Sequence, residues 1–343
     1  MTDDSSQLRE RAQLAASILD ARDRLRAHVR RTPFDRSLPL SARLGGEVWL
    51  KDEHLQHTGS FKARGALHKI LTLSPIQRAQ GVVAASSGNH GAGLAWACRL
   101  QGVRAVIFVP EQASPAKVAM IERYGAEVRH EGVDGVDTEA HARAIAERDG
   151  STYVSPYNDL DVICGQGTIA VEIVEQLTAQ VPDGVLDAIV VAVGGGGLIA
   201  GIAAYLKHVM PTVRVIGALP ANSPVMAESV AAGRIITRTS FPTLSDGTAG
   251  GIEPGAVTFP LCQALVDQWI QVDEGAIAAS MRRYVEEHHQ VIEGAAGVAL
   301  AALERLAESG DAAPSVHGAR VGVVLCGANI STSTLVDVLQ GTG

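Results

Sequence analysis

The sequence predicts an α/β protein made of two doubly wound lobes, with a ligand site in the cleft between them. A chain of 343 residues that is 46% apolar and 19% charged can bury a large core, and at this length it usually divides into two lobes. Short β-branched runs alternate with helical stretches along the chain. This βαβ pattern is typical of parallel sheets covered by helices. Such folds bind ligands beyond the carboxyl ends of their strands.

The first half of the chain contains several of these alternating units. Residues 5–31 carry apolar residues at helical spacing and predict an N-terminal helix. The units that follow predict strands at 48–50, 81–85, 105–109 and near 127–129, and helices at 60–71, after the 86–91 turn as far as residue 100, and at 115–124.

The second half repeats the pattern. It predicts helices at 168–178 and 198–210, and strands at 188–193, 213–218 and 321–325. Residues 188–206 carry no charge and are long enough to span a membrane. Four consecutive glycines interrupt this stretch, so a buried strand, a turn and a helix explain it better.

Charge and cysteine content restrict the partners and the compartment. The formal net charge is −8 and no cluster of Lys or Arg stands out, which argues against nucleic acid and anionic membranes as partners. The acidic, polar N-terminus does not look like a signal peptide. Four scattered cysteines form no CxxC pair and indicate free thiols in a reducing compartment, so we expect a cytoplasmic protein.

The first motif with chemical content is Thr58-Gly-Ser-Phe-Lys-Ala-Arg-Gly65. A lysine on a helix is normally a solvated charge. Lys62 lies among small residues that let a ligand or another backbone approach closely. A lysine becomes a nucleophile when burial or a nearby cation lowers its pKa, so Lys62 is a candidate.

The second motif, Ser86-Ser-Gly-Asn-His-Gly91, lies between a predicted strand and a predicted helix. The Ser and Asn residues could simply cap the helix. Two serines, a glycine and an asparagine exceed what capping needs, and backbone N–H groups at a helix N-terminus bind anions. The motif therefore favours a carboxylate site.

The third motif is the tetraglycine turn Gly194–Gly197, which is followed by Leu198 and a helix. This arrangement suits a phosphate group. A dinucleotide site would need an acidic residue at the end of the next strand, but that strand ends Ile216-Gly-Ala-Leu-Pro220. A monophosphate fits better. An amine, a carboxylate cradle and a monophosphate cradle together point to pyridoxal 5′-phosphate (PLP) with an amino-acid substrate.

The motifs also resemble a known family when they are taken in order along the chain. The pattern comprises Lys51-x-Glu53, Gln56, the Lys62 motif as far as Ala66, Ser86–Gly91, Gly165-Gln-Gly-Thr168, the tetraglycine turn and Cys326-Gly-x-Asn329. It resembles the fold-type II PLP enzymes, which share the tryptophan-synthase-β-like fold, and among them the threonine/serine dehydratases (ammonia-lyases) and serine racemases. The resemblance covers roughly residues 30–330.

The resemblance implies a role for each matching residue. Lys62 would bind the cofactor and remove the Cα proton, Phe61 would lie beside the cofactor ring, and Asn89 would bind its 3′-hydroxyl. Gly194, Gly195, Gly196, Gly197 and Leu198 would hold the phosphate. Cys326 would face the pyridine nitrogen, with Glu293 near the cofactor. Ser86, Ser87, Gly88, Asn89 and His90 would bind the substrate, and Ser87 matches the racemase acid/base in position.

Three features depart from the family pattern or limit it. Leu219 and Val225 stand where relatives carry acidic ligands for a divalent cation, so we expect no metal site there. Residues 245–255 are unusually glycine-rich and could alter substrate preference. Only residues 330–343 follow Asn329, which predicts that no C-terminal regulatory domain is present.

The resulting expectation is a PLP-dependent ammonia-lyase that converts L-threonine, L-serine or a related β-hydroxy amino acid to a 2-oxo acid and ammonia. Serine racemase remains an alternative, as do dehydratases of 3-hydroxyaspartate or phenylserine. A non-catalytic amino-acid-binding regulator would be expected to lose the lysine or the phosphate turn. We expect a large PLP-binding domain of residues 1–65 and 159–343, a small substrate-side domain of residues 66–158, and a homodimer or homotetramer.

Overall fold

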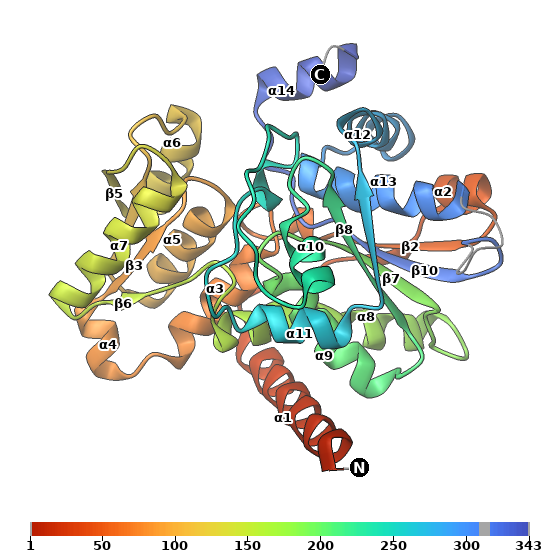
Figure 1. Cartoon of the computed structure of the whole chain (residues 1–343), viewed down its shortest axis with the longest axis horizontal. Helices are drawn as coiled ribbons and strands as arrows, with labels where there is room; N and C mark the ends of the chain where they lie inside the picture. Colours follow the sequence, from red (N-terminus) through yellow and green to blue (C-terminus); the bar gives the residue numbers. More distant parts are fainter. Residues whose placement is uncertain (1, 309–315, 342–343) are drawn as a thin grey trace.

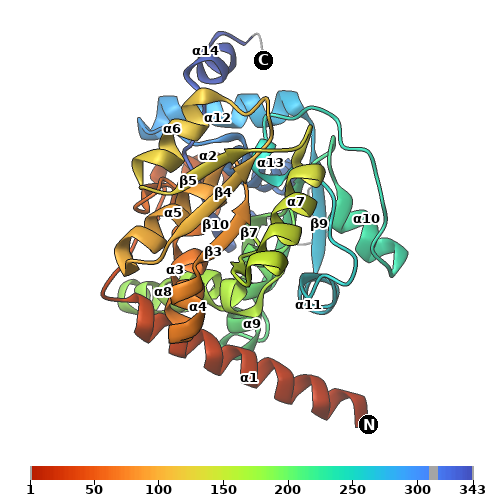
Figure 2. The ribbon, with the colours of Figure 1, turned by 90° about the vertical axis from the view of Figure 1, so that its left-hand side faces the viewer.

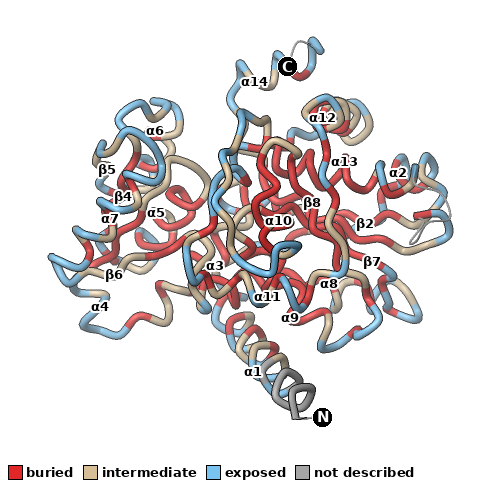
Figure 3. The backbone as a smooth tube through the Cα atoms, in the orientation of Figure 1, coloured by how far each residue is buried: buried red, intermediate tan, exposed pale blue. Residues whose placement is uncertain are grey.

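The computed structural model describes residues 2–308 and 316–341, so parts of the predicted large domain (residues 1, 309–315 and 342–343) lie outside the described residues. The α/β prediction is confirmed, because the described residues form two separate sheets flanked by helices (Figure 1). The sheets lie side by side, and the inner strands β4, β7 and β8 are buried along all or almost all of their length (Figure 3).

The larger sheet has six strands in the order β1-β2-β10-β7-β8-β9. All neighbouring strands are parallel except β1, which pairs antiparallel with β2 at the edge. The sequence analysis missed β1 and β9, which lie at the two edges. The strand bounds are β1 Phe34–Arg36, β2 Glu47–Lys51, β7 Ala188–Ala192, β8 Arg214–Pro220, β9 Gln268–Val272 and β10 Arg320–Val324.

The smaller sheet has four parallel strands in the order β5-β4-β3-β6. Every one of its strands comes from the stretch between residues 82 and 153, and its edge strand β6 was not predicted from the sequence. The strand bounds are β3 Val82–Ala85, β4 Ala105–Val109, β5 Glu127–His130 and β6 Thr152–Tyr153.

Helices cover both faces of each sheet. Helix α13 packs on one face of the larger sheet with α12 behind it, while α8, α9 and α1 lie on the other side. In the smaller lobe, α7 lies on one face and α5 on the other, with α6 against α5 (Figure 2). The bounds of these helices are α1 Thr2–Leu25, α5 Asn89–Gln101, α6 Pro115–Arg123, α7 Gly135–Asp149, α8 Leu160–Gln180, α9 Gly197–Val209, α12 Glu274–His288 and α13 Gly294–Glu308.

The other α-helices among the described residues have 6 to 11 residues. Of these the sequence analysis predicted α3 alone, and it also gave no helix at α7, α12 or α13. The shorter helices are α2 Leu38–Leu44, α3 Lys62–Thr72, α4 Pro75–Gln80, α10 Val225–Ala232, α11 Thr258–Leu265 and α14 Thr332–Gln340, together with the single-turn 3₁₀ helices η1 Glu53–Leu55 and η2 Asp246–Thr248. No helix within the described residues is long and apolar enough to cross a membrane.

The ends of two predicted helices differ from the observed ones. Helix α1 ends at Leu25 rather than at residue 31, and a turn follows in which the backbone N–H groups of His28 and Val29 both donate to the carbonyl of Leu25. Helix α8 begins at Leu160, eight residues before its predicted start at 168, because Asp159 caps it by accepting hydrogen bonds from the N–H groups of Asp161 and Val162.

Helix α3 joins the two lobes, since it packs against α5 on one side and α8 on the other. Glycines allow the close contact with α8. A Cβ atom on Gly65 would lie 2.3 Å from Nε2 of Gln166, and one on Gly165 would lie 2.6 Å from the Cα of Gly65. The first residue of this joining helix is Lys62.

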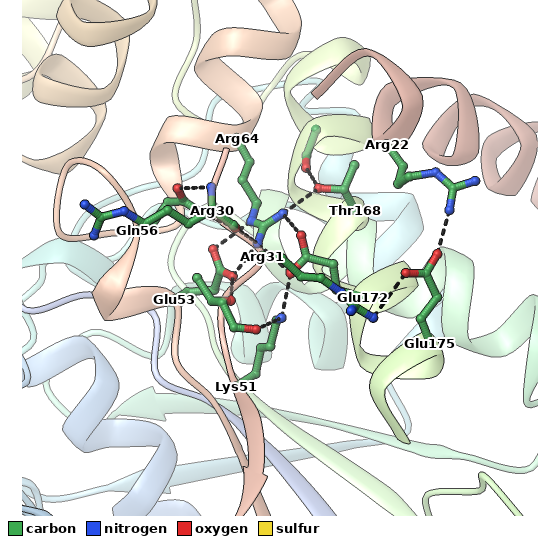
Figure 4. Close-up of polar contacts among 12 residues, drawn as sticks. Arg22, Arg30, Arg31, Lys51, Glu53, Gln56, Arg64, Thr168, Glu172 and Glu175 are labelled. Carbon is green, nitrogen blue, oxygen red and sulfur yellow. Dashed lines mark hydrogen bonds and ion pairs between the residues drawn. The ribbon is translucent and has the colours of Figure 1, made fainter. Parts of the chain in front are cut away.

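A buried ion cluster fixes the side of α3 that faces the larger lobe (Figure 4). The guanidinium of Arg64 donates to Glu53 of η1 and to Glu172 of α8, with Nη2–Oε1 and Nη1–Oε1 distances of 2.7 Å each. Lys51 at the end of β2 donates to the second oxygen of Glu172 over 2.6 Å. Buried charges of this kind are tolerated when each is paired and hydrogen-bonded. The cluster therefore ties β2, η1, α3 and α8 into one unit.

Candidate active site

A cavity of about 480 Å³ lies where the carboxyl ends of β3, β7 and β10 meet. This is where ligands bind in parallel α/β folds. The cavity brings together every residue that the sequence analysis selected. These residues are Phe61, Lys62, Ser86, Ser87, Gly88, Asn89, His90, Gly194, Gly195, Gly196, Gly197, Leu198, Glu293 and Cys326.

Lys62 is the first residue of helix α3, and its side chain lines the cavity. The amine donates a hydrogen bond of 2.8 Å to the carbonyl oxygen of Pro156 and lies 5.2 Å from the centre of the Phe61 ring. Burial lowers the pKa of Lys62 to about 8, although Cys326 and Glu293 partly oppose this shift. A minor fraction of this amine is therefore neutral, and nucleophilic, near neutral pH, far more than for an ordinary lysine.

The tetraglycine turn connects β7 to the start of α9. Gly196 has a φ of +88°, a conformation that side chains with a Cβ rarely adopt. A Cβ on Gly195 would lie 2.4 Å from the ring of Tyr157, so no larger residue fits between this turn and the ring. The first N–H groups of α9 have no partner within the helix, and they are suited to an anion at this end.

The Ser86–His90 segment connects β3 to α5 in the same way. The N–H of Gly88 donates to Oγ of Ser86 over 3.2 Å, while a Cβ on Gly88 would meet nothing within 4 Å. Burial, together with the nearby Lys62, lowers the pKa of His90 to about 3. His90 is therefore neutral, and its Nε2 lies 2.9 Å from the carbonyl of Val154. With the ring proton on Nε2, Nδ1 of His90 cannot donate to a carboxylate, so the donors in this segment are backbone N–H groups and the hydroxyls of Ser86 and Ser87.

Glu293 lies directly before α13 and connects several cavity residues. Its two oxygens accept hydrogen bonds from Nδ2 of Asn89 at 2.9 and 3.0 Å, and one also accepts from the N–H of Asn329 at 3.0 Å. Asn329 in turn donates to Oδ1 of Asn89 over 2.7 Å. Burial raises the pKa of Glu293 to about 7, although the hydrogen bond from Asn89 opposes this shift.

Cys326 follows β10, at the base of the cavity. Its carbonyl accepts a hydrogen bond of 3.0 Å from the N–H of Phe61, which links β10 to the turn that carries Lys62. Burial and the neighbouring Glu293 raise the pKa of the Cys326 thiol well above its ordinary value. The group at this position is therefore a neutral thiol, which does not act as an anionic partner for a protonated ring nitrogen.

The sequence analysis gave no role to several other residues that line the cavity. Pro156 and Tyr157 come from the loop after β6, and Asn329 comes from the motif after Cys326. Residues 246–251 of the glycine-rich segment also line it. The high glycine content of that segment is the feature of the sequence that could have identified it as part of the cavity wall. Pro156 contributes a backbone carbonyl, for which a sequence carries no signal.

The residues around the cavity fit PLP. The cradle at Gly194–Gly197 is too tight to accept side chains and ends at a helix N-terminus, as a monophosphate requires. An amine with a lowered pKa lies in the same cavity, which suits an aldehyde. Within the described residues no group of three or more His, Cys, Asp or Glu side chains could hold a metal ion. In the segment after β8, Asn222 donates to the carbonyl of Pro242, and the hydroxyls of Ser223 and Ser240 form a hydrogen bond.

This geometry defines a PLP-dependent enzyme with its active site between two α/β lobes. Comparison with known proteins agrees, because residues 25–327 match the family described as "Pyridoxal-phosphate dependent enzyme", and the chain belongs to that family.

Three relatives show where in the family the chain lies. It is 41% identical to an L-threonine ammonia-lyase from Thermotoga maritima over 94% of this chain and 77% of the relative. It is 37% identical to a serine racemase from Arabidopsis thaliana over 95% of this chain and 96% of the relative. The structure of threonine deaminase isoform 2 from Solanum lycopersicum superposes with a TM-score of 0.90 and 31% identity, covering 97% of this chain and 94% of that one.

Proposed function

We propose that the protein is a PLP-dependent ammonia-lyase that converts L-threonine, L-serine or a related β-hydroxy amino acid to a 2-oxo acid and ammonia. The observation that carries the proposal is the single cavity that holds a desolvated lysine, a glycine phosphate cradle and an anion-binding turn. The similarity to threonine ammonia-lyases over nearly the whole chain supports the choice of reaction.

When bound, PLP supplies an electrophilic aldehyde and an electron sink next to the substrate's amino group. Residues of the chain would bind the cofactor and the substrate and transfer the proton. The tetraglycine turn and the N-terminus of α9 would bind the phosphate, and the Ser86–His90 segment would bind the substrate carboxylate with backbone N–H groups at the start of α5.

Lys62 is the proposed base. With a pKa near 8, its amine can take the proton from the substrate's Cα and hold it at Nζ, and the carbonyl of Pro156 orients that atom. The β-hydroxyl takes up one proton and leaves as water, and the proton that Lys62 removed from Cα balances this proton over the whole elimination. The released enamine takes up water and loses ammonia to give the 2-oxo acid.

Asn89, Glu293 and Cys326 would contact the cofactor ring. The Glu293–Asn89–Asn329 hydrogen bonds hold the Asn89 amide in one orientation. The neutral thiol of Cys326 would leave the ring nitrogen without an anionic partner, which makes the ring a milder electron sink and favours elimination over transamination.

Serine racemase is the second candidate, because Ser87 lines the same cavity as Lys62 and could act as an opposing acid/base. The deciding experiment incubates the PLP-loaded protein with L-serine, L-threonine, 3-hydroxyaspartate and phenylserine in turn, and quantifies the 2-oxo acid, ammonia and D-isomer. We expect equimolar oxo acid and ammonia from L-threonine or L-serine. D-serine as the main product would establish the racemase instead, and no turnover of any substrate would refute the proposal.

The same proposal includes the domains and the cellular setting. The large PLP-binding domain of residues 1–65 and 159–343 would hold the phosphate turn, and the small domain of 66–158 would provide the substrate turn, in line with the membership of the two sheets. The four free, buried cysteines support a reducing cytoplasm. A homodimer or homotetramer stays a prediction, and light scattering would test it.

A further inference from the structure

The glycine-rich segment of residues 245–255, which we name the strap, borders the cavity without a role in the proposed chemistry. Its residues 246–251 line the cavity, and Gly250 has a φ of +123°. Such a backbone is flexible unless other contacts hold it. Glu253, near the end of the strap, makes most of the side-chain contacts that hold it to the loop after β6.

The carboxylate of Glu253 accepts hydrogen bonds from three side chains. One oxygen accepts from Oγ of Ser155 at 3.3 Å, and the other accepts from Nδ2 of Asn158 at 3.0 Å and from Nη2 of Arg143 at 2.5 Å. The backbone N–H of Glu253 donates to the hydroxyl of Tyr157 over 2.9 Å. Only 18% of the Glu253 side chain is exposed.

Three of these partners, Ser155, Tyr157 and Asn158, flank Pro156 in the chain. Ser155 Oγ also accepts hydrogen bonds from the N–H groups of Tyr157 and Asn158, so the loop from Ser155 to Asn158 is folded around one hydroxyl. Asn158 is fixed a second time, because its Oδ1 accepts from the N–H of Val257 just beyond the strap. Glu253 therefore holds the loop at both ends of the Pro156–Tyr157 pair.

This pair contacts two parts of the proposed machinery directly. The carbonyl of Pro156 is the hydrogen-bond acceptor of Lys62 Nζ. The ring of Tyr157 packs on Gly195, and its backbone lies 3.0 Å from the position a Cβ on Gly197 would take. A shift of the loop would move both the acceptor at the lysine and the wall behind the glycine cradle.

We propose that Glu253 is a positioning residue, which through Ser155, Asn158 and Tyr157 fixes the carbonyl that orients Lys62 and the ring that supports the phosphate cradle. The inference rests on the proposed function. The strap thereby keeps the amine of Lys62 desolvated and aligned. Because the contacts reach Lys62 through a backbone carbonyl, the effect of losing Glu253 is measurable on the lysine itself.

The first test uses the cofactor-free protein and therefore does not depend on catalysis. Acetic anhydride labelling across a pH series, read by mass spectrometry of the Lys62 peptide, gives the labelling midpoint of this amine. In Glu253→Ala, water reaches the loosened loop, so we expect the midpoint to rise by about one pH unit toward that of an ordinary lysine. Glu253→Gln keeps one acceptor oxygen, which can serve Asn158, so its midpoint should lie between those of the wild type and Glu253→Ala.

The second test measures cofactor affinity and turnover. Glu253→Ala should bind PLP about tenfold more weakly and lower kcat by about tenfold to a hundredfold, with KM for L-threonine little changed, because misalignment of a reacting group affects the chemical step. Glu139→Gln is the matched control. Glu139 pairs with the same Arg143 on α7 but contacts none of the loop residues named above. It should behave as wild type.

The outcomes separate this inference from the proposed function. A folded Glu253→Ala with wild-type labelling midpoint, PLP affinity and kcat overturns the inference. Should that variant fail to fold, Glu253→Asp, one methylene shorter, gives the same test with the same expected directions. A Lys62→Met variant that keeps full turnover refutes the proposed function instead, whatever the Glu253 variants do.

Discussion

Two buried lysines, Lys51 and Lys62, lie near opposite sides of the start of α3 in different surroundings. Burial is the main cause that lowers the pKa of each. Lys51 is fully buried and donates to Glu172, to Gln176 and to the carbonyl of Thr32. Lys62 enters a cavity and has one carbonyl as its recorded hydrogen-bond partner, with no ion pair among those of the described residues.

The comparison shows that burial alone does not make a lysine reactive. At Lys51 the carboxylates of Glu172 and Glu53 oppose the desolvation, and every donor has a fixed partner, so the charge contributes to structure. At Lys62 the acidic neighbours Cys326 and Glu293 oppose the lowering of the pKa less than desolvation causes it, and the amine lines the cavity. A desolvated, weakly paired amine beside a cavity is the usual setting of a reactive lysine.

The largest expected effect follows from removing the cavity lysine. Lys62→Met should lower turnover by more than about a thousandfold, because the proposed base is lost. Its stability should change by less than about 1.5 kcal/mol, since only one hydrogen bond to a carbonyl disappears. Steady-state kinetics and urea unfolding of the same preparation measure both. Turnover within tenfold of the wild type would show that Lys62 is not the catalytic base, which the comparison of the two lysines assumes.

Lys51→Met should instead lower the stability strongly and leave cofactor binding intact. It leaves Glu172 with one cation fewer in a buried site, which costs about 3–5 kcal/mol of unfolding free energy. PLP should still bind the folded variant, because Lys51 does not line the cavity. Asp149→Asn, which breaks an exposed pair with Arg148, is the control and should leave the urea midpoint unchanged. A Lys51→Met variant as stable as wild type would show that the cluster contributes nothing.

The sequence predicts the cavity better than the cluster. Short local motifs identify the cavity residues Lys62, Ser86–Gly91 and the tetraglycine turn. Glycines and small polar residues at the ends of strands are typical of ligand sites, so these motifs can be recognised without knowing the fold. Lys51, Glu53 and Arg64 belong to the pattern that resembles the family, but nothing in the sequence indicates that they are buried or that they pair with one another and with Glu172. Their pairing depends on β2, α3 and α8 meeting in space, at sequence separations of up to 121 residues.

The same reasoning explains which elements were found. Long apolar strands such as β4, β7 and β8 are fully or almost fully buried and stand out from their neighbours. The two-residue strand β6 and the edge strands β1 and β9 have mixed burial and no clear pattern. The contribution of Pro156 to the active site is a backbone carbonyl, which any residue type could supply.

The last prediction compares two buried carboxylates, one from each site, through the pH dependence of stability. Burial alone would raise the pKa of both. At Glu53, Arg64 and Lys51 outweigh burial and lower the pKa, so its charge stabilises the fold at neutral pH and this stabilisation is lost as the pH falls. At Glu293 burial prevails and the pKa rises from 4.5 to about 7. The folded protein then holds this proton more tightly than the unfolded chain.

Stability should therefore fall as the pH rises from about 4.5 to about 7, by about 3 kcal/mol from Glu293 alone. The measurement is urea unfolding of the cofactor-free protein at a series of pH values, with Glu293→Gln as the reference because it stays neutral throughout. The wild type should lose stability relative to Glu293→Gln across this window and stay level above it. If the difference in unfolding free energy between the wild type and Glu293→Gln did not change with pH, Glu293 would titrate normally, and Asn89 and Asn329 would solvate its charge fully. In that case Glu293 would carry a stabilised charge like the carboxylates of the ion cluster, and Lys62, His90 and Cys326 would remain the cavity groups whose ionisation burial disfavours.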